Sequence, residues 1–317
     1  MTEAAVLTAA GWVILLLAGL MLLVSLRPRR KVMRIVFGIL TLLALIIGGT
    51  LFWYTHRPLP PEVNETLFQG ITYIRDVRSV PRPLIVHVVN VDLDAPGLHF
   101  FVTPGGVDIP ARTVSQFADE FDLQLAINGD YFAPWYDSFP GDYYPHAGDP
   151  VDTHGLAASE GTLFSDGSAP VFDTLYISAG STVSFDTPNG DIYNAISGLP
   201  LLLFEGKNLV ENAEDDYYVG LNPRTAVGLD ETGRMLILML VDGRQPGYSE
   251  GVSLNELCDL LLEYGAYHAI NFDGGGSVTL VAENADGTIQ VLNSPIHRRI
   301  PGNERPVANH LGIYAQR

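Results

Sequence analysis

The sequence of 317 residues is poor in cysteine and in lysine. Cys258 is the only cysteine, so no internal disulfide can form. We expect it to be a buried side chain rather than a nucleophile, because free cysteine is commonly buried. Lys31 and Lys207 are the only lysines, against 36 acidic residues and a formal net charge of −18. This balance argues against nucleic acid as a partner, since phosphate backbones are bound by many basic side chains.

The chain also lacks the common phosphate-binding and metal-binding motifs. No lysine follows the glycines at 274–276, which excludes a Walker loop. No two histidines have the H-x-x-x-H spacing, and we expect no cofactor. The loop 137–152 offers possible Ca²⁺ ligands, but its spacing is not that of an EF-hand, so a solvated loop over a cleft is favoured. Its four aspartates are Asp137, Asp142, Asp149 and Asp152.

Residues 1–57 differ from the rest of the chain in being basic and apolar. They contain six of the 18 basic residues and one acid, Glu3. Two uncharged runs, at about 4–26 and 35–54, are each long enough to cross a hydrocarbon core of ~30 Å. We therefore predict a transmembrane hairpin of two helices at the start of the chain.

The charges around these runs predict their orientation. The segment 27–34 carries five positive charges, which favours a cytoplasmic loop, so that everything after residue 57 is extracytoplasmic. Trp53 and Tyr54 end the second run, where aromatic rings favour the membrane interface. One alternative is a signal peptide, but the Met-Thr-Glu start lacks the positive charge that such a peptide needs, and a second long run follows. The other alternative is a buried soluble hairpin, which two long runs without any charge do not favour. The expected location is the cell membrane, with the body at the cell surface.

The remaining chain is expected to form one domain after a short linker. Prolines after His56 indicate a stiff linker and entry segment at 58–83, followed by a domain at 84–317. Continuous apolar runs at 84–91 and 235–241 predict strands buried on both faces. Residues 225–235 predict a hairpin, with Gly233 in the left-handed region.

Two helices are indicated by capping boxes. Thr113 and Ser253 each begin an S/T-x-x-E/Q pattern, and the second helix runs to Tyr264. The order of strand 235–241, helix and strand 268–272 suggests a βαβ crossover. The fold class predicted is α+β: a sheet-rich mixed domain with a few packed helices, preceded by the transmembrane hairpin.

Polar residues and glycines follow several predicted strands. Asp273 precedes three consecutive glycines directly after an apolar strand, an arrangement that lets a backbone approach a ligand closely. Arg224, Arg244 and Arg305 lie in such clusters, and a guanidinium suits bidentate recognition of phosphate or carboxylate, although surface ion pairs are the alternative for each. The carboxylates in or beside these clusters are candidate catalytic groups: Asp130, Asp242, Asp273 and Glu304.

In their order along the chain, these clusters resemble the phosphodiester glycosidase family over approximately residues 84–315. The motifs are Asn128-Gly-Asp-Tyr-Phe132, Ser197-Gly-Leu-Pro200, Pro223-Arg-Thr-Ala-Val-Gly228, Val241-Asp-Gly-Arg244, Asn271-Phe-Asp-Gly-Gly-Gly-Ser277 and Glu304-Arg-Pro-Val-Ala-Asn309. The first motif departs from the family pattern, in which a second glycine stands where this chain has Asp130.

The resemblance implies hydrolysis of a sugar-1-phosphodiester or related glycosidic bond in surface glycans. It implies that Asp273, Glu304 and Asp242 are catalytic. Phosphate binding would then fall to Arg224, Arg244, Arg305, Gly274, Gly275, Gly276 and Ser277. Asn128, Asp130, Asn271 and Asn309 would contact the sugar.

Two other functions stay open from the sequence. One is a non-catalytic glycan-binding or polysaccharide-export module, in which the aromatic loop 131–144 stacks on sugars. The other is a phosphodiesterase that breaks the P–O bond, a reaction that normally relies on metal ions held by carboxylates and histidines. The sequence shows no motif for such a metal site.

Overall fold

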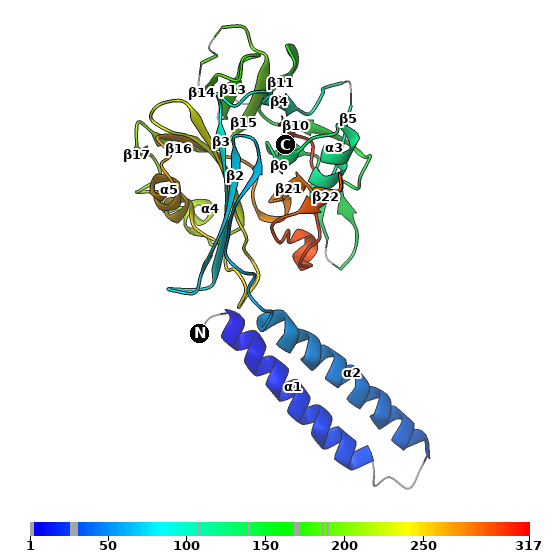
Figure 1. Ribbon diagram of the computed structural model, residues 1–317. Coiled ribbons are helices and arrows are strands. Elements are labelled where there is room, and N and C mark those ends of the chain that lie inside the picture. Colours follow the sequence, from blue (N-terminus) through cyan, green and yellow to red (C-terminus); the bar gives the residue numbers. More distant parts are fainter. Residues whose placement is uncertain are drawn as a thin grey trace.

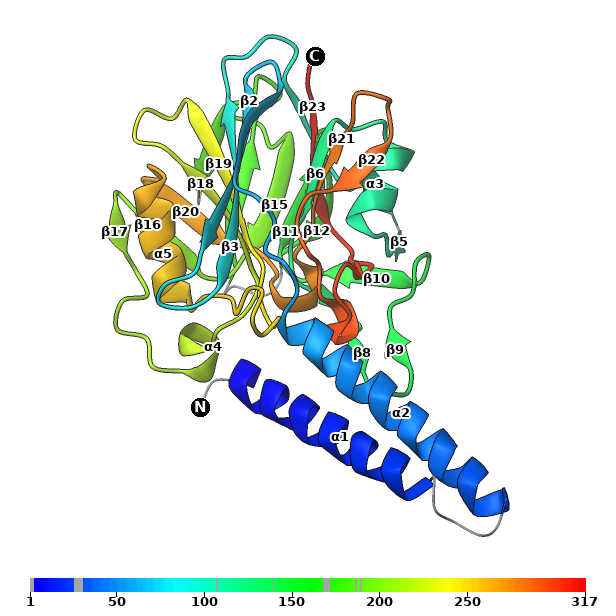
Figure 2. The same cartoon turned by 60° about the horizontal axis from the view of Figure 1, so that its bottom comes forward.

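A computed structural model describes residues 3–25, 31–106, 108–138, 140–167, 172–185, 187–188 and 190–317. Two long apolar helices, α1 (Glu3–Ser25) and α2 (Lys31–Thr55), form an antiparallel hairpin that extends away from one end of the sheet-rich domain (Figures 1 and 2). The second helix begins at Lys31, four residues before the apolar run expected at 35–54. Residue 26 of the first expected run and residues 27–30 of the expected basic loop lie outside the described residues.

The largest sheet has eight strands and is antiparallel throughout. In spatial order these are β1 (Val63–Phe68), β2 (Ile71–Arg78), β3 (Leu84–Asp92), β19 (Met235–Val241), β18 (Arg224–Leu229), β20 (His268–Asn271), β16 (Leu201–Phe204) and β17 (Lys207–Asn208). The predicted hairpin is confirmed, because β18 pairs with β19 and Gly233 has φ +70°. Strands β19 and β20 run in the same direction but are separated by β18, so the predicted crossover skips one strand.

The expected linker at 58–83 is wrong over most of its length. Strands β1 and β2 occupy residues 63–78, and β2 pairs with β3 along its whole length. Ile71 and Tyr73 are buried and alternate with half-buried neighbours, the period-two pattern of a strand that packs one face on a core. The domain therefore begins about twenty residues earlier than predicted.

Two five-stranded sheets pack against the eight-stranded sheet. One contains β22 (Ile289–Val291), β21 (Leu280–Glu283), β6 (Leu125–Asn128), β23 (His310–Tyr314) and β4 (His99–Val102). The other contains β12 (Thr162–Asp166), β11 (Leu156–Ser159), β15 (Asn194–Gly198), β13 (Asp173–Ile177) and β14 (Val183–Phe185). The main hydrophobic core lies between these sheets and the eight-stranded one.

Helices cover the outer faces of this sandwich. Helix α5 (Leu254–Glu263) packs on the eight-stranded sheet, and α3 (Val114–Glu120) packs on the sheet containing β6, so the two lie on opposite sides (Figure 1). Both predicted capping boxes are present, at Thr113 and Ser253. Cys258 lies in the core beneath α5, where burial raises its thiol pKa to about 12. The predicted sheet-rich α+β class is confirmed.

Short elements complete the domain around one end of the sandwich. They are β5 (Ile109–Pro110), β7 (Phe132–Ala133), β8 (Tyr136–Asp137), β9 (Tyr143–Tyr144), β10 (Pro150–Thr153), α4 (Asp216–Val219), and the 3₁₀ turns η1 (Gly275–Ser277) and η2 (His297–Arg299). The hairpin of α1 and α2 joins the domain at this same end, beside these turns (Figure 2).

Candidate active site

The strand pairing brings several of the predicted clusters to one edge of the sandwich. Because β18 is antiparallel to both β19 and β20, its first residue, Arg224, lies beside the segments that follow their last residues. Those segments begin with Asp242 and Phe272. In the opposing sheet, Asn128 ends β6 opposite His310 at the start of β23, which places the 305–309 segment at the same edge.

A cavity of about 280 Å³ opens at this edge. Its lining includes all three predicted arginines and one carboxylate, that of Asp273. The residues around it are Tyr131, Phe132, Trp135, Tyr217, Asn222, Arg224, Arg244, Asp273, Gly274, Gly275 and Arg305. Three guanidiniums and one carboxylate give this lining a positive balance in a strongly acidic protein.

The three glycines allow the arginines to lie directly against the backbone. A Cβ on Gly276 would come within 2.6 Å of Arg305 Nη2, and one on Gly275 within 2.9 Å of Arg244 Nη1. A Cβ on Gly274 would meet the backbone oxygen of residue 223 at 2.8 Å. Any side chain at these positions would displace the guanidiniums or the backbone, which explains why three glycines follow Asp273.

The arginines differ in how much of their hydrogen-bonding capacity is already used. Arg224 donates from Nη2 to the carbonyls of Tyr217 (2.8 Å) and Gly220 (3.1 Å), so it holds the segment that carries Tyr217. Arg244 donates from Nε and Nη2 to Asn222 Oδ1 at 2.9 and 2.7 Å. Arg244 Nη1 has no hydrogen bond within the described part of the chain and can donate to a ligand.

Arg305 is held by side chains on three sides. Its Nη1 donates to Ser277 Oγ (3.3 Å), its Nε donates to His297 Nδ1 (3.3 Å), and its guanidinium lies 5.0 Å from the Trp135 ring centre. Burial, followed by the charge of Arg305, lowers the pKa of His297 to about 4, so the imidazole is neutral and can accept this bond. Among the described residues, Arg305 Nη2 has no hydrogen-bond partner.

The arginines also raise the positive potential at one another. Burial is the main cause that lowers the pKa of Arg244, and the charges of Arg305 and Arg224 lower it further. Arg224, Arg244 and Arg305 do not appear in any ion pair among the described residues. The surface ion pairs considered from the sequence are therefore not what these arginines form, and the cavity suits an anion.

Asp273 is the carboxylate at the bottom of the cavity. Burial raises its pKa, while the charge of Arg305 and a hydrogen bond from Ser277 Oγ (2.5 Å to Oδ2) act in the opposite direction. Its backbone carbonyl accepts from Asn128 Nδ2 at 2.7 Å, which ties the loop after β20 to the end of β6. The backbone of Asp273 is thus held by the eight-stranded sheet and by the sheet that contains β6.

Asp130, the departure from the family pattern, lies beneath the cavity. It is 1% exposed, and its two oxygens accept from the amides of Tyr131 (2.7 Å) and Gly155 (2.8 Å). Burial raises its pKa to about 8, with the charge of Asp273 contributing in the same direction. Asp130 therefore fixes the backbone that carries Tyr131, and it does not line the cavity.

The predicted asparagines are buried beneath the cavity and do not line it. Asn128 binds Thr225 and Thr279 as well as the Asp273 carbonyl, so its side chain is fully used by the protein. Asn271 Nδ2 lies 2.7 Å from the Leu199 carbonyl and 3.0 Å from Tyr131 Oη. Asn309 Nδ2 is buried without a partner in the described part of the chain. None of the three lines the cavity, and their contact with the sugar stays a prediction.

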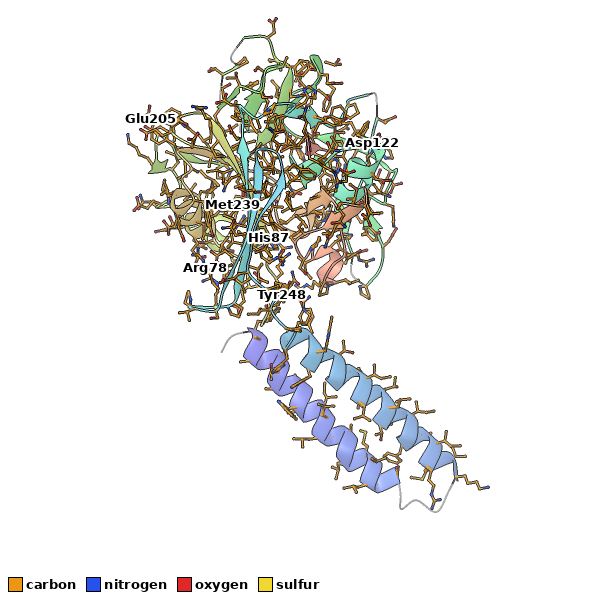
Figure 3. The ribbon with its side chains drawn as sticks, viewed as in Figure 1. Arg78, His87, Asp122, Glu205, Met239 and Tyr248 are labelled. Atoms are coloured by element: carbon orange, nitrogen blue, oxygen red, sulfur yellow. The ribbon has the colours of Figure 1, made fainter. Side chains whose placement is uncertain are left out.

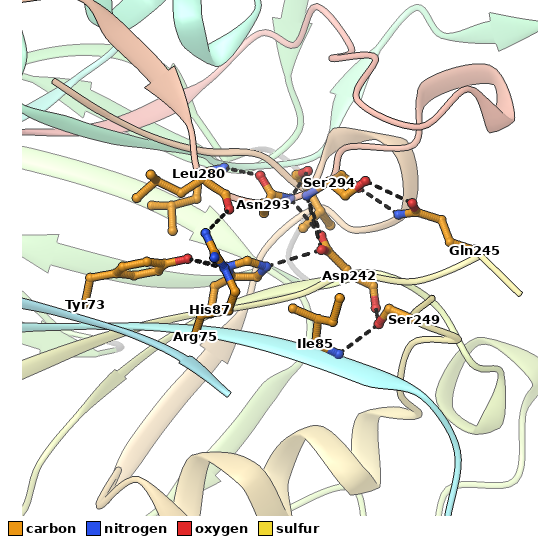
Figure 4. A network of polar contacts seen from close by, with 12 residues as sticks. Tyr73, Arg75, Ile85, His87, Asp242, Gln245, Ser249, Leu280, Asn293 and Ser294 are labelled. Carbon is orange, nitrogen blue, oxygen red and sulfur yellow. Dashed lines mark hydrogen bonds and ion pairs between the residues drawn. The ribbon is translucent and has the colours of Figure 1, made fainter. Parts of the chain in front are cut away.

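Asp242, which the resemblance marks as catalytic, does not line the cavity. Its carboxylate accepts from Asn293 Nδ2 (3.1 Å) and from the Ser294 amide (3.0 and 3.1 Å), and it lies 3.2 Å from His87 Nε2 (Figure 4). His87 Nδ1 in turn contacts Tyr73 Oη at 2.8 Å. Both oxygens of Asp242 are saturated by fixed donors, so the residue anchors the loop after β19.

Glu304 also lies away from the cavity lining. Its carboxylate accepts from Ser115 Oγ (2.6 Å) and the Ser115 amide (3.0 Å), in the first turn of α3. A carboxylate is favourable there because the first backbone N–H groups of a helix have no partner within the helix. Glu304 and Arg305 are neighbours in the sequence, but Glu304 contacts α3 whereas Arg305 lines the cavity.

The sequence missed two residues of the cavity, Tyr217 and Asn222. Tyr217 Oη lies 2.5 Å from Tyr131 Oη, and its ring lies 5.3 Å from the guanidinium of Arg224. Tyr217 follows an acidic segment with no motif, whereas Asn222 stands directly before the Pro-Arg-Thr motif and was detectable by position. Trp135, Tyr131 and Phe132 belong to the aromatic loop expected to stack on sugars.

Three of the four aspartates considered as Ca²⁺ ligands lie close to an arginine or histidine side chain. Asp137 pairs with Arg298 (3.6 Å), and Asp149 lies 3.3 Å from His146 Nδ1. Over the described ranges, no group of three or more His, Cys, Asp or Glu side chains has the arrangement of a metal site. The loop around the cleft is instead held by polar contacts such as Arg298 Nη2 to the Gly141 carbonyl (2.6 Å).

Solved structures share this fold. The catalytic domain of zebrafish N-acetylglucosamine-1-phosphodiester α-N-acetylglucosaminidase, auto-inhibited by its pro-peptide, superposes with a TM-score of 0.56 at 22% identity and covers 83% of this chain and 86% of that one. A putative exported protein from Burkholderia pseudomallei gives a TM-score of 0.57 at 14% identity, covering 82% and 98%. At these identities the likeness concerns the fold.

Two relatives in sequence carry the same name as the zebrafish enzyme. The human N-acetylglucosamine-1-phosphodiester α-N-acetylglucosaminidase is 26% identical over 192 residues, 56% of this chain and 36% of that protein. The bovine enzyme of the same name is 44% identical over 61 residues, 19% of this chain and 11% of that protein. The alignment thus spans about a third of the human relative. Both relatives carry the name of a glycosidase-type hydrolase.

The family of this chain is shown by a family model that matches more than half of its length. Residues 121–314 match the family model described as phosphodiester glycosidase. The chain belongs to the phosphodiester glycosidase family, and the resemblance drawn from its motifs is confirmed.

Proposed function

We propose that this protein hydrolyses sugar-1-phosphodiesters, with the cavity around Asp273 as its active site. The observation that carries the proposal is the convergence of three arginines and one carboxylate around the triple glycine. In the reaction, the oxygen of water forms a new bond to the anomeric carbon. The bond from that carbon to the phosphate oxygen breaks, the phosphomonoester leaves with the electron pair, and the proton that the water loses ends on the phosphomonoester.

The residues divide this work between the two ends of the breaking bond. Arg244 and Arg305 donate to the phosphate, where negative charge grows as the bond breaks, and fixed donors in a partly buried site stabilise such charge strongly. Asp273 acts at the anomeric carbon, because its carboxylate is the one in the cavity lining. Aromatic residues Tyr131, Trp135 and Tyr217 form the wall for the sugar.

We further propose that α1 and α2 anchor the enzyme in a membrane, with the domain outside the cytoplasm. Both helices expose apolar side chains along their length, such as Leu16 (73% exposed) and Ile35 (62%). A hydrocarbon environment would cover these side chains, whereas water would leave them exposed. A surface glycan is then the accessible substrate.

The direct test incubates the full chain with a panel of sugar-1-phosphodiesters, beginning with N-acetylglucosamine 1-phosphate esters, and measures free reducing sugar and phosphomonoester. We expect both products in equal amounts from the wild type and a near-complete loss in Asp273→Asn. If no member of the panel is cleaved while sugar affinity persists in both proteins, the site is a glycan-binding module.

A further inference from the structure

The membrane hairpin touches the active-site loop directly. Tyr54 Oη, at the end of α2, donates to the backbone carbonyl of Arg244 at 3.1 Å. Arg57 places its guanidinium 4.0 Å from the ring centre of Tyr248 and hydrogen-bonds Gln245. Tyr248 lies where the domain meets the hairpin (Figure 3). The loop that carries Arg244 is therefore held at the end of the hairpin where Trp53 and Tyr54 mark the membrane interface.

A second cavity, of about 540 Å³, lies between the hairpin and this loop. The helices contribute Glu3, Leu7, Leu51 and Tyr54, and the domain contributes Leu221, Arg244, Gln245, Pro246, Glu250 and Arg299. Arg244 lines both this cavity and the active-site cavity. The two cavities therefore share Arg244, whose Nη1 can donate to a phosphate.

Four of the ten residues that line the second cavity are apolar, two on the helices and two on the domain. Leu7, Leu51, Leu221 and Pro246 supply apolar wall, and Leu221 stays 43% exposed. Ile300, next to Arg299 in sequence, is 54% exposed. An alkyl chain that starts at a phosphate on Arg244 and passes along this wall would reach the hydrocarbon region without crossing water, and burying its CH₂ groups would strengthen binding.

We propose that the substrate is a lipid-linked sugar, a sugar-1-phosphodiester whose alcohol is a long membrane hydrocarbon. This inference rests on the proposed function. The sugar occupies the aromatic cavity, the phosphate binds Arg244 and Arg305, and the lipid chain leaves through the second cavity into the bilayer. Water adds to the anomeric carbon, the sugar is released, and the lipid phosphate stays in the membrane. Anchoring enzyme and substrate in one membrane raises their effective concentration.

The test uses the full chain in proteoliposomes and two esters of N-acetylglucosamine 1-phosphate. One carries a long isoprenoid chain in the same vesicles, and the other is the water-soluble methyl ester. We expect the isoprenoid ester to be cleaved with at least a tenfold higher kcat/KM. In Leu221→Gln, the ratio of the two rates should fall by about tenfold or more, because a polar amide in the apolar wall opposes the lipid chain.

Leu209→Gln is the matched control, since Leu209 follows β17 away from the hairpin and is 51% exposed. Its ratio of rates should equal that of the wild type. Taking a ratio removes any general loss of folded enzyme. Cleavage of the methyl ester with no preference for the isoprenoid ester, or a ratio unchanged in Leu221→Gln, overturns the lipid proposal and leaves the proposed function standing. Cleavage of neither ester counts against both.

Discussion

Asp242 and Asp273 occupy similar places in the sequence and very different places in the structure. Each is followed by glycine just beyond a buried strand of the same sheet. Asp242 is saturated by Asn293, Ser294 and His87, whereas Asp273 keeps its carboxylate in the cavity lining beside the arginines. The difference teaches that a strand-end aspartate becomes a candidate for chemistry only where the surrounding donors leave it available to a ligand.

The contrast between Asp273 and Asp242 fails if Asp273 is not needed for hydrolysis. We expect Asp273→Asn to lower kcat by about 10³-fold, within the range found for carboxylates that act directly in bond breaking. The amide has nearly the same shape and can still accept from Ser277, so the protein should stay folded. The measurement is initial-rate release of reducing sugar. Glu304→Gln, whose carboxylate lies at α3, should stay within a few-fold of the wild type, and equal losses in both variants would refute the distinction.

A second prediction tests whether the arginines bind the phosphate as it leaves. Arg305→Ala should lower kcat/KM by about 10²-fold or more, because a donor to the leaving phosphate is lost. The loss should shrink for esters of more acidic alcohols, whose phosphates need less stabilisation as they leave. Arg234→Ala removes a 68% exposed arginine paired with Asp94 and should leave kcat/KM unchanged. A loss that does not depend on the leaving group contradicts this role for Arg305.

Replacing Asp242 should lower the free energy of unfolding of the protein. Asp242→Asn leaves the Ser294 amide and His87 with a weaker acceptor, a change worth about 2 kcal/mol for a buried charged hydrogen-bond network. For a domain of this size, that lowers Tm by roughly 4–8 °C, measurable by thermal unfolding in detergent. The folded variant should still turn over substrate at a rate close to the wild type. An unchanged Tm together with lost activity would return Asp242 to the list of catalytic candidates.

Asp130 should make the stability of the protein depend on pH. Its pKa rises from 3.8 to about 8 on folding, so the folded protein favours the protonated carboxyl. That contribution is fully present below about pH 4 and is lost as the pH rises through about 8. The Tm of the wild type should therefore fall relative to that of Asp130→Asn between pH 5 and pH 9. Parallel Tm curves would show that this carboxyl is ionised in the folded protein.

Much of the fold and part of the site followed from the sequence for identifiable reasons. Capping boxes and apolar runs depend on neighbouring residues, so the helices at 114–120 and 254–263 and strands such as β3 and β19 were predictable. The arginines were marked by their rarity and by their place in turns. Strand β2 was missed because its buried and half-buried residues alternate without a long apolar run.

The direction in which each acidic side chain points was not predictable. Ser115, which binds Glu304, lies 189 positions earlier in the chain. Asn293 and Ser294, which donate hydrogen bonds to the Asp242 carboxylate, come 51 and 52 positions after it. Such partners are set by how the sheets pack, which local patterns do not encode. Tyr217 reaches the cavity for the same reason, since Arg224 holds the backbone of its segment.

The most direct measurement follows the oxygen of water during hydrolysis of a sugar-1-phosphodiester in H₂¹⁸O. If the anomeric carbon is attacked while Arg244 and Arg305 hold the departing phosphate, mass spectrometry will find the label in the released sugar and not in the phosphomonoester. Label in the phosphate would mean that the P–O bond breaks, and the roles given to Asp273 and the arginines would then be wrong.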